Sequence, residues 1–277
     1  MRVLIVGGSG FLGGELIRLC AGLGHVVGAT RFSGPAGGGA SPAEWFPVDV
    51  RSRAAVAEVV GGFRPDVTIN AAYRASDWAT TADGAAHVAA AVARSGGRLV
   101  HVSSDAVFSG DAHSYDETCP PDPVNPYGAA KAAAETAVRA LVPGAAIVRT
   151  SLIVGGGSTH EAFVRALATG SASGVLFTDD VRCPVHVADL AAALLELAER
   201  DLPGVHHVAG PEAVSRYELG LLIARRDGLP EERLRPGLRA TAGVRGPLAV
   251  RLDCSATRRR LQVRLRGASE FLKPTRS

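Results

Sequence analysis

Short apolar runs alternate with segments of helical spacing along the first half of the chain. The runs that are typical of buried strands cover residues 2–6, 25–29, 66–70, 98–103 and 145–149. Apolar residues recur at helical spacing between them, which predicts helices at residues 12–23, 53–60, 85–93 and 129–141. Strands and helices that alternate through short connections favour a mostly parallel sheet covered by helices. The pattern therefore predicts an α/β fold with a doubly wound parallel sheet of the Rossmann type.

A glycine-rich turn, GGSGFLG, joins the first predicted strand to the first predicted helix. It spaces Gly7, Gly10 and Gly13 three residues apart. The first glycine permits a tight turn, the second lets the backbone approach a pyrophosphate, and the third lets helix and strand pack closely. Because a strand precedes it and a helix follows, the turn predicts a dinucleotide site that also includes Phe11 and Leu12.

The end of the second predicted strand bears on the choice between NAD and NADP. An acidic residue there would bind the ribose 2′-hydroxyl, whereas an arginine favours a 2′-phosphate. This chain has Arg31 and no acid nearby, which favours NADPH over NADH. Asp49 and Val50 could receive the adenine amino group. Ala71 and Ala72 follow the third predicted strand and would leave room for the adenosine and its ribose.

The second half of the chain is less regular, with helices expected near residues 160–169, 187–199 and 215–226 and a short strand at 205–208. We expect residues 1–150 to form an NAD(P)-binding Rossmann domain, with a returning piece near 186–210. Residues 151–277 should then form mainly a smaller, interleaved C-terminal α/β region that binds substrate, since a doubly wound domain leaves its ligand crevice open at the strand ends.

Tyr127 and Lys131 stand four residues apart in the segment NPYGAAK. On a helix these positions share one face. An ammonium group beside a phenol stabilises the charged form of the phenol and so lowers the tyrosine pKa. A tyrosine of this kind can exchange a proton with a carbonyl or an alcohol near neutral pH. Beside a dinucleotide site, the pair indicates an oxidoreductase.

A specific combination of segments occurs in order along nearly the whole chain. The segments are GGSGFLG, INAA, VSSDAVFSG, YDETCPPDPVNPYGAAKAAAE, VRTSLIVG, VADLA and RLDCS. In these the chain resembles the extended short-chain dehydrogenase/reductases, and within them the dTDP-4-dehydrorhamnose reductase branch. The resemblance implies an NADPH-dependent carbonyl reductase that acts on the keto group of a nucleotide-linked deoxysugar.

Carried over by position, the resemblance implies that Ser104, Tyr127 and Lys131 are the catalytic residues. Tyr127 would protonate the carbonyl oxygen, and Ser104 would hydrogen-bond that oxygen and stabilise developing charge. Lys131 would hold the nicotinamide ribose and keep the tyrosine acidic. Asp105 would either contact the substrate or brace the strand end.

The chain departs from the branch where the substrate would be gripped. Ala106 replaces a tyrosine, Leu152 replaces a tryptophan, and the stretch between Asn70 and Ser103 is several residues short. We expect a more open, more apolar pocket, so the exact deoxysugar is open and dTDP-4-dehydrorhamnose is expected to be a poor substrate. Arg182 and Arg251 are the candidates for diphosphate contacts, because a guanidinium grips phosphate oxygens in a bidentate manner. Alternatively, both arginines only brace the two parts of the chain.

Composition narrows the choice of partners. The formal net charge is +3 over 277 residues, which gives no case for nucleic acid or an anionic membrane. No apolar run is long enough to span a bilayer. The four cysteines include no CxxC pair, so neither a zinc site nor a disulfide framework is predicted. These features favour a reducing cytoplasm, and a homodimer is left open.

Three other functions stay open. The first is a reductase or dehydrogenase of the same fold with a non-sugar carbonyl from specialised metabolism. The second is a non-catalytic, dinucleotide-binding regulatory subunit, against which the retained Tyr127 argues because a pure binder needs no proton donor. The third is an epimerase or dehydratase with bound NAD, against which Arg31 argues.

Overall fold

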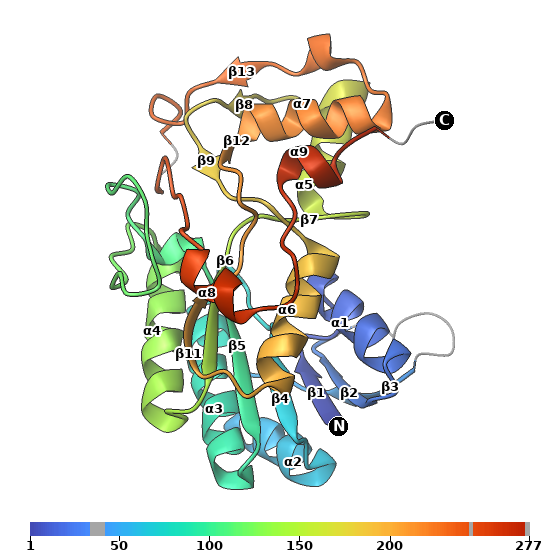
Figure 1. Ribbon diagram of the computed structural model, residues 1–277, viewed down its shortest axis with the longest axis vertical. Helices are drawn as coiled ribbons and strands as arrows, with labels where there is room; N and C mark the ends of the chain where they lie inside the picture. The colour runs from blue at the N-terminus through green and yellow to red at the C-terminus, as the bar shows by residue number, and fades with distance from the viewer. Residues whose placement is uncertain (34–41, 244–245, 275–277) are drawn as a thin grey trace.

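In the computed structural model, which describes residues 1–33, 42–243 and 246–274, a seven-stranded parallel sheet lies in the lower half of Figure 1. Its strands are β1 (Arg2–Val6), β2 (Val26–Arg31), β3 (Ala43–Pro47), β4 (Val67–Asn70), β5 (Arg98–Ser104), β6 (Ala146–Thr150) and β11 (Gly204–His207). The order across the sheet is β11-β6-β5-β4-β1-β2-β3. Strand order reverses between β1 and β4, where a crevice for ligands forms beyond the carboxyl ends.

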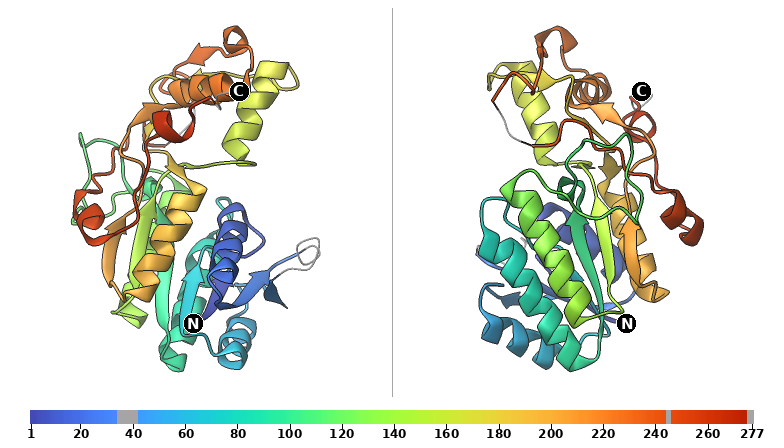
Figure 2. Two further views of the ribbon diagram at one scale, coloured as in Figure 1. Left: turned by 45° about the vertical axis from the view of Figure 1, so that its right-hand side comes forward. Right: turned by 90° about the vertical axis from the view of Figure 1, so that its left-hand side faces the viewer.

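Helices cover both faces of this sheet, as the two views of Figure 2 show. One face packs against α1 (Phe11–Gly22) and α6 (Val187–Glu199). The opposite face packs against α2 (Arg53–Phe63), α3 (Gly84–Ser95) and α4 (Pro126–Leu141). The predicted doubly wound Rossmann fold is confirmed.

The residues of β1 explain why both faces are covered. Alternate side chains of a strand point to opposite faces. Val3 and Ile5 join the core beneath α1 and α6, whereas Leu4 and Val6 join the core beneath α2 and α3. All four side chains are buried, and each such burial stabilises the fold by about 1.5–3 kcal/mol relative to an exposed side chain.

A smaller region lies beyond the carboxyl ends of the sheet, in the upper half of Figure 1. Its main helices are α5 (Thr159–Thr169) and α7 (Arg216–Asp227), which share an apolar core. Each begins with a capping box, in which the serine before the helix and the glutamate three residues later satisfy each other's backbone N–H groups. The starts of both helices are therefore well defined.

Short elements complete this part of the fold. They are the strands β7 (Ile153–Val154), β8 (Leu176–Phe177), β9 (Val181–Arg182), β10 (Val185–His186), β12 (Val214–Ser215) and β13 (Pro236–Gly237), and the helices α8 (Ser255–Arg260) and α9 (Ala268–Phe271). Single turns of other helix types occur at Ala79–Asp83, Asp105–Val107 and Glu231–Arg233. No helix of the described residues is long and apolar enough to cross a membrane.

The observed elements differ from the sequence pattern in several places. Helix α4 begins at Pro126, three residues before the predicted start, because Asn125 caps it and proline suits the first helical turn. Strand β3, Ala43–Pro47, lies before Asp49 and was not among the apolar runs. Strand β11, from within the predicted returning piece, pairs with β6. The division of the chain into two parts stays an interpretation.

Candidate active site

The glycine turn between β1 and α1 is shaped for close approach by a ligand. Gly7 has φ of +90°, and a Cβ there would lie 2.8 Å from the backbone nitrogen of Ala72. A Cβ at Gly13 would clash with the carbonyl oxygen of Gly7. Gly10 caps α1 without a side chain. The turn therefore brings β1, β4 and the N-terminus of α1 together, and that N-terminus favours an anion.

Two cavities flank this turn. A cavity of about 260 Å³ is lined by Gly7, Thr30, Asp49, Val50 and Ala72, among others. A larger cavity of about 640 Å³ is lined by residues from the whole predicted site, among them Gly10, Phe11, Leu12, Gly13, Ser104, Asp105, Ala106, Tyr127, Lys131, Leu152 and Arg182. Both cavities share Gly7, Gly10, Ala71 and Tyr73. Together they form a continuous binding region along the carboxyl edge of the sheet.

Helix α4 delivers Tyr127 and Lys131 to the floor of the larger cavity. The Asn125 side chain caps the helix by accepting from the backbone N–H of Gly128 at 2.8 Å. A Cβ at Gly128 would clash with the carbonyl oxygen of Ala106, so this glycine lets α4 approach the end of β5. Tyr127 consequently lies in the first turn of α4, and Lys131 follows one turn later.

Strand β5 delivers the third member of the predicted catalytic trio. Lys131 Nζ donates to the carbonyl oxygen of Val102 at 2.9 Å, which ties α4 to β5. Ser104 ends the strand; its Oγ accepts from the backbone N–H of Ala106 at 3.2 Å and donates to Asp105 at 3.3 Å. The structure thus brings Ser104, Tyr127 and Lys131 to one cavity.

Burial sets the protonation of this site. It lowers the pKa of Lys131 to about 8, although Glu135 partly opposes this. Loss of water raises the pKa of Tyr127 well above its ordinary value, Tyr73 adds to that rise, and Ser104 reduces it. The pKa of Tyr127 is therefore raised rather than lowered as the sequence led us to expect, and loss of water is the largest cause. Tyr127 is fully protonated at neutral pH, as a proton donor must be.

The family model described as RmlD substrate binding domain matches residues 1–274. The chain belongs to this family. The predicted resemblance of this RmlD-family protein to the extended short-chain dehydrogenase/reductases is confirmed.

Relatives of two kinds resemble this RmlD-family protein. The dTDP-4-dehydrorhamnose reductase of Mycobacterium tuberculosis H37Rv is 35% identical over 253 residues, which cover 85% of this chain and 78% of the relative. The methionine adenosyltransferase 2 subunit beta of Xenopus laevis is 30% identical, covering 92% and 80%. The crystal structure of Bacillus anthracis dTDP-4-dehydrorhamnose reductase in complex with NADP has a TM-score of 0.84 and 26% identity, and covers 98% and 95%.

Asp105 of the RmlD-family protein braces the ends of neighbouring strands. Its side chain is buried. Ser151, just after β6, donates to Asp105 Oδ2 at 2.6 Å, and Arg182 Nε lies 3.6 Å from the same oxygen. Asp105 also lines the larger cavity. Of the two roles considered for this carboxylate, the contacts favour the brace.

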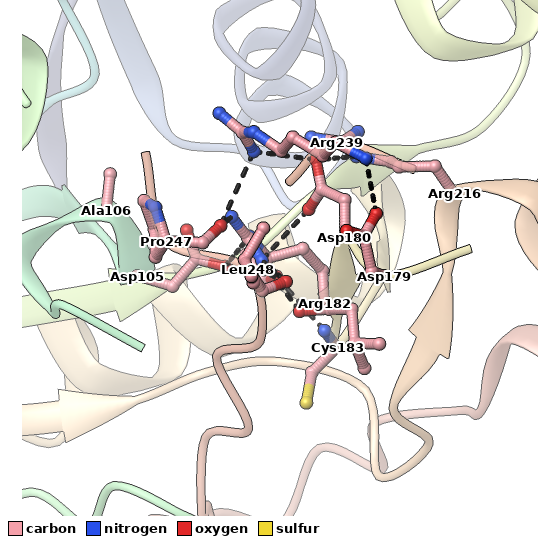
Figure 3. Close-up of polar contacts among 12 residues, drawn as sticks. Asp105, Ala106, Asp179, Asp180, Arg182, Cys183, Arg216, Arg239, Pro247 and Leu248 are labelled. Carbon is pink, nitrogen blue, oxygen red and sulfur yellow. Dashed lines mark hydrogen bonds and ion pairs between the residues drawn. The ribbon is translucent and has the colours of Figure 1, made fainter. Parts of the chain in front are cut away.

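Arg182 is a brace as well. Its guanidinium donates to the carbonyl oxygens of Pro247 at 2.7 Å and Leu248 at 3.1 Å, and it pairs with Asp180 at 2.9 Å (Figure 3). The residue is 5% exposed. These contacts engage both terminal nitrogens of the guanidinium. They favour the alternative, in which Arg182 braces the two parts of the chain, over the expected diphosphate contact. A buried guanidinium with these partners holds β9 to the segment before residue 250.

Arg251 does not reach the cavities within the described residues. Its backbone carbonyl accepts from Tyr115 N–H at 2.9 Å, next to a bridge between Tyr115 and Leu252. Its segment thus anchors the loop before α4. The expectation that Arg251 binds diphosphate is not supported.

Two other arginines, missed from the sequence, line the larger cavity. Arg216 starts α7, and Arg239 follows β13. Asp180 Oδ2 lies 3.3 Å from Arg216 Nε and 2.8 Å from Arg239 Nη1 (Figure 3). Arg216 also lies 3.3 Å from His160 Nδ1. No local motif marks these residues, because the fold gathers them from three distant segments.

A third cavity of about 270 Å³ adjoins this cluster. Its walls are mostly apolar, with Phe163, Leu176 and Phe177 among them. It shares His160, Arg216 and Arg239 with the larger cavity. The basic groups therefore mark the junction between the cavity that holds Tyr127 and an apolar one in the C-terminal region.

Tyr73 is another residue that the sequence motifs did not single out. The ring centroid of Tyr73 lies 5.8 Å from that of Tyr127, and Lys131 Nζ lies 5.1 Å from the ring centroid of Tyr73. It follows directly after INAA, so its place beyond β4 is the signal that could have identified it. Tyr73 stands between the two cavities that meet at the glycine turn.

Proposed function

We propose that this RmlD-family protein is an NADPH-dependent reductase of the keto group of a nucleotide-linked deoxysugar. The observation that carries the proposal is the convergence of Ser104, Tyr127 and Lys131 on one cavity that begins at the dinucleotide-type glycine turn. The reductase relative from M. tuberculosis and the NADP complex from B. anthracis support both the reaction and the cofactor.

The residues around the glycine turn fit a dinucleotide. The close packing at Gly7 and Gly13 leaves the uncapped N-terminus of α1 for a pyrophosphate. Ala71 and Ala72 leave room beside it, and Asp49 lies in the cavity for the adenosine. When bound, NADPH supplies the hydride. The protein supplies binding, orientation and a proton.

The proton comes from Tyr127. Its raised pKa keeps the hydroxyl protonated, so it can donate to the carbonyl oxygen of the substrate. The Ser104 hydroxyl hydrogen-bonds the same oxygen and stabilises the negative charge that develops there. Lys131, charged below a pKa of about 8, favours proton release from Tyr127 during the reaction and holds the ribose of the cofactor.

The cluster around Asp180 suits the diphosphate of the substrate. Arg216 and Arg239 replace Arg182 and Arg251 as the proposed phosphate contacts, since both line the junction of two cavities. The nucleobase would occupy the apolar cavity beside Phe163 and Phe177, and the sugar would extend to Tyr127. Guanidinium groups suit phosphate oxygens because their N–H groups form a planar fork.

Two small or aliphatic residues shape the sugar site. Ala106 and Leu152 both line the larger cavity. We propose that they admit a bulkier or less polar sugar than the tyrosine and tryptophan of the dTDP-4-dehydrorhamnose reductase branch would. A homodimer and a cytoplasmic location stay predictions of the sequence; four free thiols support a reducing compartment.

The function is tested by NADPH consumption in the presence of a panel of dTDP- and UDP-linked 4-keto-6-deoxysugars. Reduction of one panel member, with loss of turnover in Tyr127→Phe, supports the proposal. Turnover of small ketones alone would favour the non-sugar reductase. The methionine adenosyltransferase 2 subunit beta of X. laevis keeps the regulatory alternative in view, and tight NADPH binding without turnover of any carbonyl would favour it.

A further inference from the structure

We propose that Arg51 and Arg74, rather than Arg31, form the site for the 2′-phosphate of NADPH and so set the preference for NADPH over NADH. The inference rests on the proposed function only in that it requires a bound dinucleotide. It assigns the selectivity to loops after β3 and β4, outside the strand end at which the sequence pattern locates it.

The direction of the β2 side chains argues against Arg31. Thr30, the residue before it in β2, lines the smaller cavity, whereas Arg31 is not among the residues that line it. Thr30 also accepts a hydrogen bond from the backbone N–H of Gly7 at 3.0 Å. Because successive side chains of an extended strand point to opposite faces, Arg31 is directed away from this cavity. The sequence expectation for Arg31 therefore does not fit the geometry.

Two other guanidinium groups do reach the smaller cavity. Arg51 and Arg74 line it together with Phe32 and Ser33. The guanidinium carbon of Arg51 lies 5.4 Å from the ring centroid of Phe32, and that of Arg74 lies 5.8 Å from it. Both cations thus lie against one aromatic ring at the carboxyl end of β2, where a Rossmann fold receives the adenosine ribose.

Neighbouring groups contact the side chain of Arg51 and anchor the backbone of Arg74. Arg51 Nη2 lies 2.8 Å from Asp49 Oδ2, and its Nη1 lies 3.7 Å from Asp77. The backbone N–H of Arg74 donates to Thr81 Oγ1 at 3.1 Å, and that hydroxyl donates back to the Arg74 carbonyl at 2.8 Å. Thr81 is 1% exposed. The loop that carries Arg74 is therefore anchored in the core.

The remaining contacts suit a phosphate that arrives with the cofactor. The Arg51 side chain is 45% exposed, so it can turn between Asp49 and a ligand at low cost in free energy. Ser33 adds a hydroxyl to the same wall. A 2′-phosphate supplies several acceptor oxygens, which two guanidinium forks and one hydroxyl can satisfy. NADH has only a hydroxyl at that position and would gain little from either arginine.

Three variants test this assignment: Arg51→Ala, Arg74→Ala and Arg31→Ala as the matched control. Calorimetry gives Kd for NADPH and NADH, and for the fragments 2′,5′-ADP and 5′-ADP. Charge-assisted hydrogen bonds contribute about 1.5–3 kcal/mol, so each of the first two variants should weaken NADPH and 2′,5′-ADP about 10–100-fold. NADH and 5′-ADP should bind as they do to the wild type, which also shows that the variants fold.

The same data contain the results that would overturn the proposal. An unchanged NADPH-to-NADH affinity ratio in Arg51→Ala or in Arg74→Ala would contradict the two-arginine site. An equal loss of NADPH and NADH affinity would assign these arginines to the adenosine or to structure. If Arg31→Ala loses the preference for NADPH over NADH, the 2′-phosphate site would belong to Arg31 at the strand end. None of these measurements uses a sugar substrate, so they stand apart from a failure of the proposed reductase function.

Discussion

Lys131 Nζ donates a hydrogen bond to the backbone carbonyl of Val102 at 2.9 Å. The bond joins α4 to β5 two residues before Ser104, so the ammonium group and the serine hydroxyl share one rigid support. The carbonyl also gives one hydrogen-bond acceptor to the ammonium group of a residue that is only 2% exposed. The position of this charge governs the first prediction.

The free energy of unfolding should depend on pH through the titration of Lys131. Burial lowers its pKa to about 8, whereas an unfolded lysine titrates near 10.4. Between these values the unfolded chain binds the proton that the folded protein has lost, so the free energy of unfolding rises with pH. Urea denaturation of the wild type and of Lys131→Met at intervals from pH 7 to pH 11 measures this. If the free energy of unfolding of the wild type, taken relative to that of Lys131→Met, falls as pH rises, the prediction is contradicted.

Ser104→Ala should lower kcat while leaving NADPH affinity unchanged. Removal of one donor to a developing oxyanion costs about 10²–10³ in rate. The Ser104 hydroxyl also accepts from the backbone N–H of Ala106, so Ser104→Thr, which keeps a hydroxyl, is the matched variant and should retain most activity. Steady-state kinetics that show equal rates in the alanine variant and the wild type would remove Ser104 from the mechanism.

The buried ion pair of Arg149 and Glu135 should be essential for stability. Arg149 Nη2 lies 2.8 Å from Glu135, both side chains are nearly inaccessible, and Ser103 also donates to Glu135 at 2.6 Å. Arg149→Ala leaves a buried carboxylate without its partner and should cost about 3–5 kcal/mol in the free energy of unfolding.

The surface pair of Arg18 and Glu15 provides the control. The Arg18 side chain is 68% exposed, so Arg18→Ala should cost under about 1 kcal/mol. Urea denaturation compares the two variants. Similar losses in both would show that the Arg149 contact contributes no more than a surface contact does.

Arg216→Ala and Arg239→Ala should raise KM for a nucleotide sugar about tenfold or more, as expected for loss of a charge-assisted hydrogen bond. Their effect on a small ketone without phosphate should be slight. Arg251→Ala, which changes a residue outside the described cavity lining, is the control and should leave both values unchanged. If the small ketone suffers as much as the nucleotide sugar, the two arginines hold structure and not phosphate.

Local patterns predicted most elements and the pairing of Tyr127 with Lys131 because their physics is local. Apolar runs identified most strands of the sheet, and the glycine turn followed β1 as expected. The four-residue spacing of Tyr127 and Lys131 fits a single helix, which begins three residues before the predicted start. Ser104, at the end of β5, was identified through the family resemblance. These features depend on residues close together in the chain.

The remaining features of the site depend on distant segments, and the sequence did not reveal them. Arg216 and Arg239 meet at Asp180 only after α7 and the segment following β13 fold over the sheet. Arg31 is not among the residues that line the smaller cavity, and the proposal of Arg51 and Arg74 in its place depends on loops that only the fold brings together. The pKa of Tyr127 was misjudged because desolvation depends on the completed fold.

The most direct test of the account compares NADPH oxidation by the wild type and by Tyr127→Phe with a panel of nucleotide-linked 4-keto-6-deoxysugars. The account predicts that the wild type reduces at least one of them with kcat/KM of about 10⁴ M⁻¹s⁻¹ or above. It predicts that Tyr127→Phe binds NADPH with unchanged Kd yet loses about 10²-fold or more in kcat. Wild-type protein that binds NADPH but reduces no panel member, or a phenylalanine variant that keeps its rate, would contradict the central claim.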